Sequence, residues 1–350
     1  MTLIPPSEPH NPRKVSFERV ERARERDARP AEAPRGDTAP TVEMTPFTSN
    51  EGEDSQKVSF EREAGEVMHR VRFDIAYDGS EFKGWAAQPG LRTVQGTIEE
   101  ALWRVLRSDV RLVVAGRTDA GVHATGQVAH ADLTDEQWAR ATHLARGSAE
   151  GTDPVAPLAR KLRGVLRPYA DATVSRTSTA PEGFDARFSA VWRRYSYRIA
   201  DDTIGYNPLL RRDTTLVKAT LDVDKMDAAA RTLIGLHDFA AYCKPREGAT
   251  TIRTLLEYDW RRAEDGVLIA NVRADAFCHS MVRALVGACV AVGEGKLEVD
   301  DVVRLREELT RTSAFKVLDA RGLTLAEVGY PADELLADRA NQTRARRSLD

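Results

Sequence analysis

The chain has 350 residues, of which 42% are hydrophobic and 30% charged, a composition typical of a soluble globular protein. It contains no apolar run near the roughly 20 residues that a membrane-spanning helix needs, and its start does not resemble a secretory signal. These features exclude a membrane protein and predict a cytoplasmic location. The net charge of −3 neither favours nor excludes a nucleic-acid partner, because phosphates respond to a local basic face rather than to the total charge.

The three cysteines and seven histidines are scattered along the chain. The cysteines form no Cys-x-x-Cys pair, their odd number does not suit a disulfide framework, and the histidines lack zinc-ligand spacing. We therefore expect neither a disulfide framework nor a metal site. The sequence also lacks the glycine-rich loops that hold the phosphates of nucleotide cofactors, so no cofactor is expected.

Residues 1–68 differ in composition from the rest of the chain. They are rich in Pro, Glu, Arg, Ser and Thr and poor in apolar residues, so they cannot offset the entropy of ordering. They carry 10 basic and 14 acidic residues, or −4, which leaves the remainder at +1 (−3 minus −4). The hexapeptide KVSFER at 14–19 recurs at 57–62, either as a duplication without a role or as a motif for a partner. We expect a disordered N-terminal tail.

From His69 onward, the sequence predicts alternating strands and helices. Thr93 stands as the N-cap of a helix that begins at Val94, in which apolar residues recur at helical spacing as far as Leu106. The other elements expected in this half are strands at 71–77, 112–115, 126–133 and 172–179, a helix at 135–145 and an inserted loop at 146–157.

The later part of the chain repeats this order. The elements expected there are strands at 194–199, 252–260, 267–274 and 323–328, a helix at 222–234 and a strongly apolar helix at 277–292. Each half then reads β-α-β-β-α-β, the ferredoxin-like unit. We predict an α+β protein with a first half at 69–190, a second half at 191–331 and a loose, mixed-charge tail at 332–350.

A polar loop at 115–127 joins two of the expected strands. Its glycines permit tight or left-handed turns, and a rigid loop over a sheet often carries functional groups. Asp119 stands in the middle of this loop, two residues after Arg117. An Asp near Gly is also a common turn former that bonds its own backbone. The loop alone therefore allows either a structural or a catalytic role for Asp119.

Arg283 is the only charged residue in the apolar run at 281–292. A guanidinium in an apolar helix either pairs with a carboxylate or extends to solvent, because an unpaired buried charge is very costly. The residues alone leave both interpretations open.

Aromatic and basic residues alternate at 193–198, in the sequence RRYSYR. Tyr195 and Tyr197 are two residues apart and share one face of a strand. Arg187 lies in a similar segment at 184–188. Such interleaving suits RNA, because bases stack on aromatic rings while arginines meet phosphates. Ordinary cross-strand pairs on an exposed strand would give the same pattern.

Several motifs in chain order resemble those of the TruA family of tRNA pseudouridine synthases. The segments are YDGSEFKGW at 77–85, GRTDAGVH at 116–123, FDARFSA at 184–190 with RYSY at 194–197, and NVRADAFCHSMVR at 271–283. The resemblance extends over roughly residues 70–330, and so many ordered motifs are an implausible chance match.

The resemblance implies a fold and an activity. The fold is that of pseudouridine synthases, in which two ferredoxin-like halves form one continuous, mixed, mainly antiparallel sheet flanked by helices. The implied activity is isomerisation of uridine at tRNA positions 38, 39 and 40, in the anticodon arm, by a homodimer that uses no metal or other cofactor.

The resemblance also implies roles for individual residues. Asp119 matches the catalytic aspartate, and Tyr195 matches the residue that stacks on the target base. Arg117 and Arg283 match arginines that line the active site, and Arg187 falls in a segment that contacts tRNA. Two equivalent halves would bring the start of the helix that holds Arg283 near the loop that holds the catalytic Asp119. We therefore predict an ion pair between Arg283 and Asp119.

Pseudouridine formation breaks the bond between uracil N1 and ribose C1′, turns the base and joins C5 to C1′. Asp119 could attack C1′, attack the uracil ring or remove the C2′ proton, and the sequence does not choose among these. Two other functions stay open. A hydrolase of the glycosidic bond would need a second carboxylate, for which Asp185 is a candidate. A non-catalytic RNA-binding protein on the same scaffold would need none.

Overall fold

The computed structural model describes residues 68–143, 149, 151–246 and 250–344. The tail expected at 1–68 lies outside the described residues except for Met68, and so does part of the loop expected at 146–157. All structural statements below concern the described residues.

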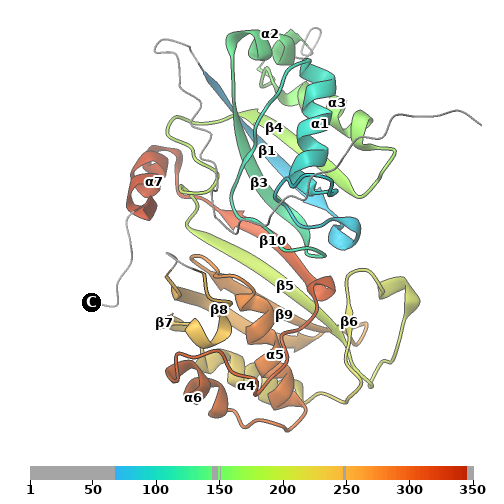
Figure 1. Ribbon diagram of the computed structural model, residues 1–350, viewed down its shortest axis with the longest axis vertical. Helices are drawn as coiled ribbons and strands as arrows, with labels where there is room; N and C mark the ends of the chain where they lie inside the picture. The colour runs from blue at the N-terminus through green and yellow to red at the C-terminus, as the bar shows by residue number, and fades with distance from the viewer. Residues whose placement is uncertain (1–67, 144–148, 150, 247–249, 345–350) are drawn as a thin grey trace, which may run out of the picture. The chain divides into compact units, whose positions relative to one another are not determined.

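Strands from both halves of the chain form one sheet (Figure 1). The strands are β1 His69–Tyr77, β2 Val113–Val114, β3 His123–Leu133, β4 Ala172–Thr179, β5 Trp192–Ala200, β6 Thr215–Leu216, β7 Gly235–Asp238, β8 Ile252–Arg262, β9 Leu268–Ala274 and β10 Leu323–Gly329. The order is β4-β1-β3-β10-β5-β9-β8-β7, with β2 paired to β3 and β6 to β5. Strand β10 is parallel to β3 and β6 is parallel to β5, while the other pairs are antiparallel.

Helices alternate with these strands. They are α1 Val94–Leu106, α2 Asp135–His143, α3 Ala156–Leu166, α4 Val223–Thr232, α5 Met281–Gly293, α6 Asp301–Glu307 and α7 Leu336–Arg344. The order confirms an α+β fold in which both halves contain the β-α-β-β-α-β unit, with α3 and short strands added. None of the helices in the described part of the chain combines the length and the apolar character that crossing a bilayer requires.

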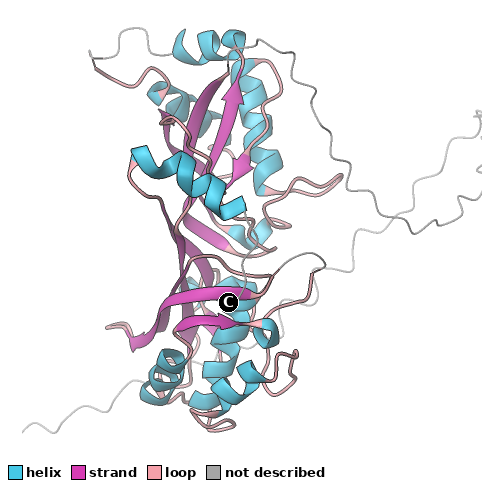
Figure 2. Ribbon diagram, turned by 90° about the vertical axis from the view of Figure 1, so that its left-hand side faces the viewer, coloured by secondary structure: helices cyan, strands magenta, loops and turns pink. Residues whose placement is uncertain are grey.

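The last strand, β10, joins the two halves of the sheet. It lies between β3 of the first half and β5 of the second, with Thr324 beside His123 and Leu325 beside Tyr195. Figure 2 shows the strands continuing from one half into the other. At this junction a Cβ on Gly126 would lie 2.2 Å from the carbonyl oxygen of Ala326, so only glycine permits so close an approach.

Helix α1 begins where the sequence predicts. The Thr93 hydroxyl accepts a hydrogen bond from the Gly96 N–H, and Ile98, Leu102 and Leu106 form a buried stripe four residues apart. Helix α3 was not predicted, because Pro157 was assigned to a loop. Proline suits the first turn of a helix, where its missing N–H would have no partner, and α3 has Pro157 in this position.

Helix α5 is shorter than expected. The sequence predicts a helix from Phe277, but α5 begins at Met281. The residue before it, Ser280, has φ 62° and ψ 9°, a left-handed conformation that interrupts any helix. Residues 275–280, called here the His279 segment, therefore form an irregular connection between β9 and α5.

The tail expected at 332–350 also needs correction. Residues 336–344 form α7, which lies beside the first half in Figure 1. The helix is anchored by Leu336 and Ala340, which are four residues apart and buried. Two small apolar contacts in a polar segment were too weak a pattern to predict this helix.

The expectation of no disulfide framework was also incorrect for one pair of cysteines. Cys243 and Cys278 form a disulfide with their Cα atoms 5.8 Å apart, whereas Cys289 is free and buried. The partners are 35 residues apart in the chain, and the β8–β9 hairpin lies between them. Spacing in the sequence carries no sign of such a tertiary pairing.

Candidate active site

Asp119 lies on the loop at 115–122, called here the Asp119 loop, between β2 and β3. The segment at 77–85 holds this loop largely through its backbone. The Trp85 N–H donates to the Thr118 carbonyl at 3.0 Å, and the hydroxyls of Tyr77 and Thr118 are hydrogen-bonded at 2.8 Å. These contacts fix the residue directly before Asp119.

Two glycines allow the supporting segment to approach this closely. A Cβ on Gly79 would lie 2.0 Å from the Val122 carbonyl oxygen, and one on Gly84 would lie 3.1 Å from the Thr118 oxygen. Gly84 also has φ +91°, which favours glycine. The glycines of the motif at 77–85 therefore serve the position of the Asp119 loop.

The structure confirms the predicted ion pair. A guanidinium nitrogen, Nη1, of Arg283 lies 3.6 Å from Asp119 Oδ2, although the residues come from different halves of the chain. The other carboxylate oxygen, Oδ1, lies 3.6 Å from Nε2 of His279. Asp119 is 37% exposed and Arg283 22%, so the pair is accessible to a substrate.

Arg283 is itself oriented by the backbone. Its Nε donates to the Leu318 carbonyl at 2.6 Å, and the Leu318 N–H donates to the Arg283 carbonyl at 3.2 Å. Gly287, one turn further along α5, allows this approach, because a Cβ there would lie 2.0 Å from the Lys316 carbonyl oxygen. The guanidinium is thus held on one side and directed toward Asp119 on the other.

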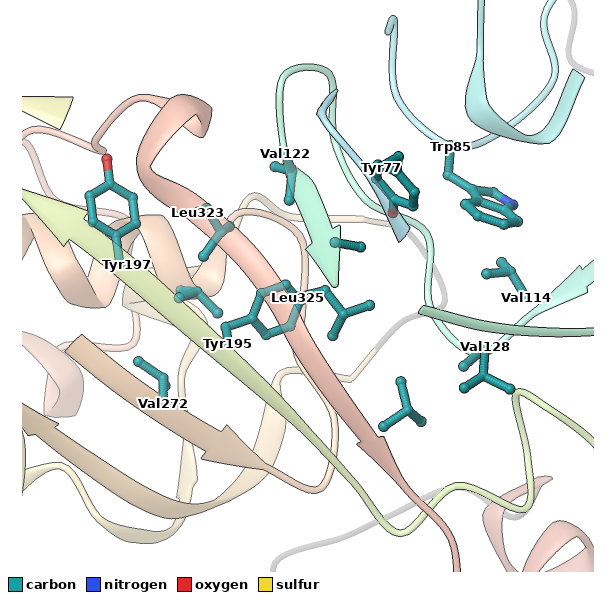
Figure 3. Packing of buried hydrophobic residues seen from close by; sticks show 14 of the residues in the cluster. Tyr77, Trp85, Val114, Val122, Val128, Tyr195, Tyr197, Val272, Leu323 and Leu325 are labelled. Carbon is teal, nitrogen blue, oxygen red and sulfur yellow. The ribbon is translucent and has the colours of Figure 1, made fainter. Parts of the chain in front are cut away.

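Tyr195 lies on β5 at the junction with β10 and is 9% exposed. Figure 3 shows its ring next to Leu325 in the apolar layer. Phe277 of the His279 segment makes an edge-to-face contact with this ring, with centroids 5.1 Å apart. Burial raises the pKa of Tyr195 well above its usual value, and the nearby Tyr77 and the charge of Asp119 add to this effect. The phenol is therefore neutral and lies within electrostatic reach of Asp119.

Tyr197 shares this face of β5 but belongs to the core. It is fully buried, and its hydroxyl donates to the Asp319 carbonyl at 2.7 Å. The alternation of aromatic residues in this strand thus comes partly from packing.

The other two predicted arginines are exposed. Arg117 precedes Asp119 on the same loop. Arg187 lies at the surface with its guanidinium over the Phe188 ring, 5.1 Å from the centroid. The structure therefore brings Asp119, Arg283 and Tyr195 together, with Arg117 on the adjoining loop, and places Arg187 on a separate segment.

Arg193 connects these segments and was not singled out in the sequence. Its guanidinium donates three hydrogen bonds of 2.9 Å, to the backbone carbonyls of Ala115, Arg187 and Asp275. These carbonyls belong to the Asp119 loop, the segment of Arg187 and the His279 segment. One side chain of β5 therefore fixes three parts of the site. The sequence showed it only as one of several arginines in RRYSYR.

His279 is the second residue that sequence reasoning missed. It was part of a quoted motif, four residues before Arg283, but an expected helix at this position gave no reason to direct it at Asp119. The described residues contain no cluster of three or more His, Cys, Asp or Glu side chains that could hold a metal ion.

A polar hollow borders Tyr195 and otherwise extends over the other face of the sheet. Its lining includes Arg194, Glu257 and Arg273. Arg194 and Ser196 alternate with Tyr195 and Tyr197, so their side chains point to the opposite face of β5. The charged side chains of this hollow therefore lie on the face opposite to the Tyr195 ring.

Comparison with known proteins identifies the family of this chain. A family model described as tRNA pseudouridine synthase matches residues 229–331. A protein of Leifsonia xyli named tRNA pseudouridine synthase A is 61% identical over 285 residues, which cover 80% of this chain and 98% of that protein. Proteins of the same name from Streptomyces avermitilis and Frankia casuarinae are each 53% identical, over 80% and 79% of this chain and 94% of each relative. The chain belongs to the TruA family of tRNA pseudouridine synthases, and its fold is the pseudouridine synthase fold.

Proposed function

We propose that this chain converts uridine to pseudouridine at positions 38, 39 and 40 in the anticodon arm of tRNA, with Asp119 as the catalytic group. The chain is a member of a family of isomerases that make pseudouridine in tRNA. The positions within tRNA and the roles of individual residues are our proposal.

The observation that carries this proposal is the setting of Asp119. Its carboxylate is partly exposed and lies 3.6 Å from each of two basic side chains, Arg283 and His279. A carboxylate held in one orientation can be aligned with one reacting carbon or proton of a bound nucleotide. This setting is compatible with attack on C1′, attack on the uracil ring or removal of the C2′ proton.

Tyr195 suits contact with the target base. The uridine must leave its stack to react, at a cost of a few kcal/mol, and an aromatic surface offsets part of that cost. Because the phenol of Tyr195 is neutral, its ring can meet an uncharged uracil without burying a charge. Exposed Arg117 and Arg187 would contact the phosphates that flank the target or lie further along the arm.

The alternative function, glycosidic hydrolysis, lacks a suitable second carboxylic acid among the candidates. Asp185 accepts hydrogen bonds from the N–H groups of Arg187 and Phe188, at 2.8 and 2.9 Å, and so shapes its own loop. Asp78, in the segment at 77–85 that supports the Asp119 loop, is a further carboxylate to consider. Burial raises the pKa of Asp78, but hydrogen bonds from Ser80 and Arg212 outweigh this effect and bring it to about 2. Asp78 is therefore ionised at neutral pH and cannot serve as the proton donor that such hydrolases need.

We also propose a cytoplasmic homodimer. The face of the sheet that bears the polar hollow carries arginines at 194, 261 and 273 and acids at 257, 259 and 327. A surface with both signs of charge suits a two-fold contact, in which the same patch meets itself. Light scattering on the purified protein would test the dimer directly.

The proposed reaction is tested with full-length protein and unmodified tRNA transcripts. Pseudouridine should appear in the anticodon arm, at the three proposed positions, without release of free uracil, and a matched sample with Asp119→Asn should contain none. Release of uracil would indicate a hydrolase instead. Tight binding of tRNA by the wild-type protein without any change in uridine would indicate an RNA-binding protein.

A further inference from the structure

We propose that His279 is a positioning residue that holds the Asp119 carboxylate at the oxygen that Arg283 does not face. This inference rests on the proposed catalytic role of Asp119. It assigns the second contact of that carboxylate to a side chain whose function would be to orient it.

Each oxygen of the Asp119 carboxylate faces a different side chain. Nε2 of His279 lies 3.6 Å from Oδ1 of Asp119, and Nη1 of Arg283 lies 3.6 Å from Oδ2. With only one partner, a carboxylate can still turn about the bond to its Cβ, whereas one partner on each oxygen limits this rotation. Two contacts on different oxygens therefore fix the plane of the Asp119 carboxylate group as well as its position.

The backbone of His279 is fixed on both sides. The His279 carbonyl accepts a hydrogen bond from the Lys244 N–H at 3.0 Å, and the preceding residue, Cys278, is bonded to Cys243. The following residue, Ser280, has φ 62°. A left-handed conformation is strained for a non-glycine residue, and such strain clusters at functional sites. Here the strained residue directly follows the one whose side chain faces Asp119.

His279 differs from His123, a histidine with a structural role, in its exposure and in its partners. His123 is 6% exposed, and both ring nitrogens have backbone partners, the Gly79 N–H at Nδ1 and the Arg321 carbonyl at Nε2, each at 3.0 Å. The side chain of His279 is 44% exposed, and its contact with Asp119 is at the open side of the site. Core packing therefore does not explain why the partly exposed imidazole of His279 points at the Asp119 carboxylate.

The test uses the full chain with tRNA under single-turnover conditions. His279→Ala should lower the rate of pseudouridine formation on the order of 10²-fold, the scale of a misplaced reacting group, while tRNA affinity stays within a few-fold. His279→Gln, which keeps a donor at similar reach, should recover most of this rate. Added imidazole should partly restore His279→Ala, because the site is open to solvent.

His237→Ala is the matched control. His237 lies on β7, at the far end of the strand order from the junction, with Nε2 3.2 Å from the Ile234 carbonyl oxygen. This variant should keep the wild-type rate and show no response to imidazole.

Three outcomes would overturn the proposal while wild-type protein still makes pseudouridine. His279→Ala could keep its full rate, or it could lose tRNA affinity instead of rate. The third outcome is that the rate stays low both in His279→Gln and in His279→Ala with added imidazole. If wild-type protein makes no pseudouridine at all, the proposed function fails, and the two failures are thereby distinguished.

Discussion

The two sides of Asp119 are built in different ways. The Asp119 loop is held largely by backbone groups, with Gly79 and Gly84 so close that a Cβ on Gly79 would collide with a carbonyl oxygen at 2.0 Å. Arg193 adds one side-chain hydrogen bond to its Ala115 carbonyl. The facing side is held by side chains, with Arg283 bonded to the Leu318 carbonyl and Arg193 to that of Asp275. The first side positions a carboxylate and the second supplies its basic partners.

The difference indicates how each side should respond to mutation. Backbone packing leaves no space for added atoms, so even a methyl group should displace the Asp119 loop. Side-chain contacts can be removed singly, so substitutions on the facing side should lower the rate while the fold persists.

Asp119→Asn should have the largest effect. The amide keeps the shape of the side chain but loses its charge and basicity, so the rate of pseudouridine formation should fall by at least about 10⁴-fold, a scale typical of a lost catalytic carboxylate. Binding of tRNA, measured by filter retention, should change only a few-fold. Substantial turnover by this variant would remove Asp119 from the proposed mechanism.

Arg283→Lys should follow. Lysine keeps the positive charge but lacks the fork that joins the Leu318 carbonyl to Asp119, so the single-turnover rate should fall on the order of 10²-fold. The lost hydrogen bond should cost only about 1–2 kcal/mol of unfolding free energy. Arg283→Met should remove activity with a similarly small loss of stability. If thermal unfolding shows that both variants are grossly destabilised, the facing side is more rigid than we propose.

Gly79→Ala should test the backbone side. Its Cβ would meet the Val122 carbonyl oxygen, so we expect a loss of about 1–3 kcal/mol from overpacking together with a clear drop in rate. Gly116→Ala is the control on the same loop, since a Cβ there meets nothing within 4 Å. Equal effects of the two substitutions on thermal unfolding and rate would contradict the role assigned to close packing.

Deletion of residues 1–68 should have the smallest effect. All the family motifs and the contacts described above lie beyond this segment, so the 69–350 fragment should keep the wild-type rate on tRNA. A folded but inactive fragment would instead give a function to the repeated KVSFER hexapeptide.

Much of this protein was determined by local patterns in its sequence. Strand β4 has the bounds that alternation predicted, Ala172–Thr179, and Thr93 caps α1 because a hydroxyl before an apolar repeat satisfies a free N–H. These two inferences depend only on near neighbours in the chain. The pairing of Asp119 with Arg283 needed more, since a charge in an apolar helix can also extend to solvent, and the family resemblance together with the two equivalent halves pointed to Asp119 as the partner.

Only the tertiary structure decided the contacts between distant segments. Strand β10 lies between β3 and β5, and His279 faces Asp119 from 160 residues away, because the path of the chain brings these segments together. Periodicity could not predict that Ser280 would adopt a left-handed conformation and end the expected helix, since the spacing of apolar residues carries no information on a single backbone angle. Arg193 is likewise one arginine among several in the sequence, and its three carbonyl partners exist only because three remote loops converge beside β5.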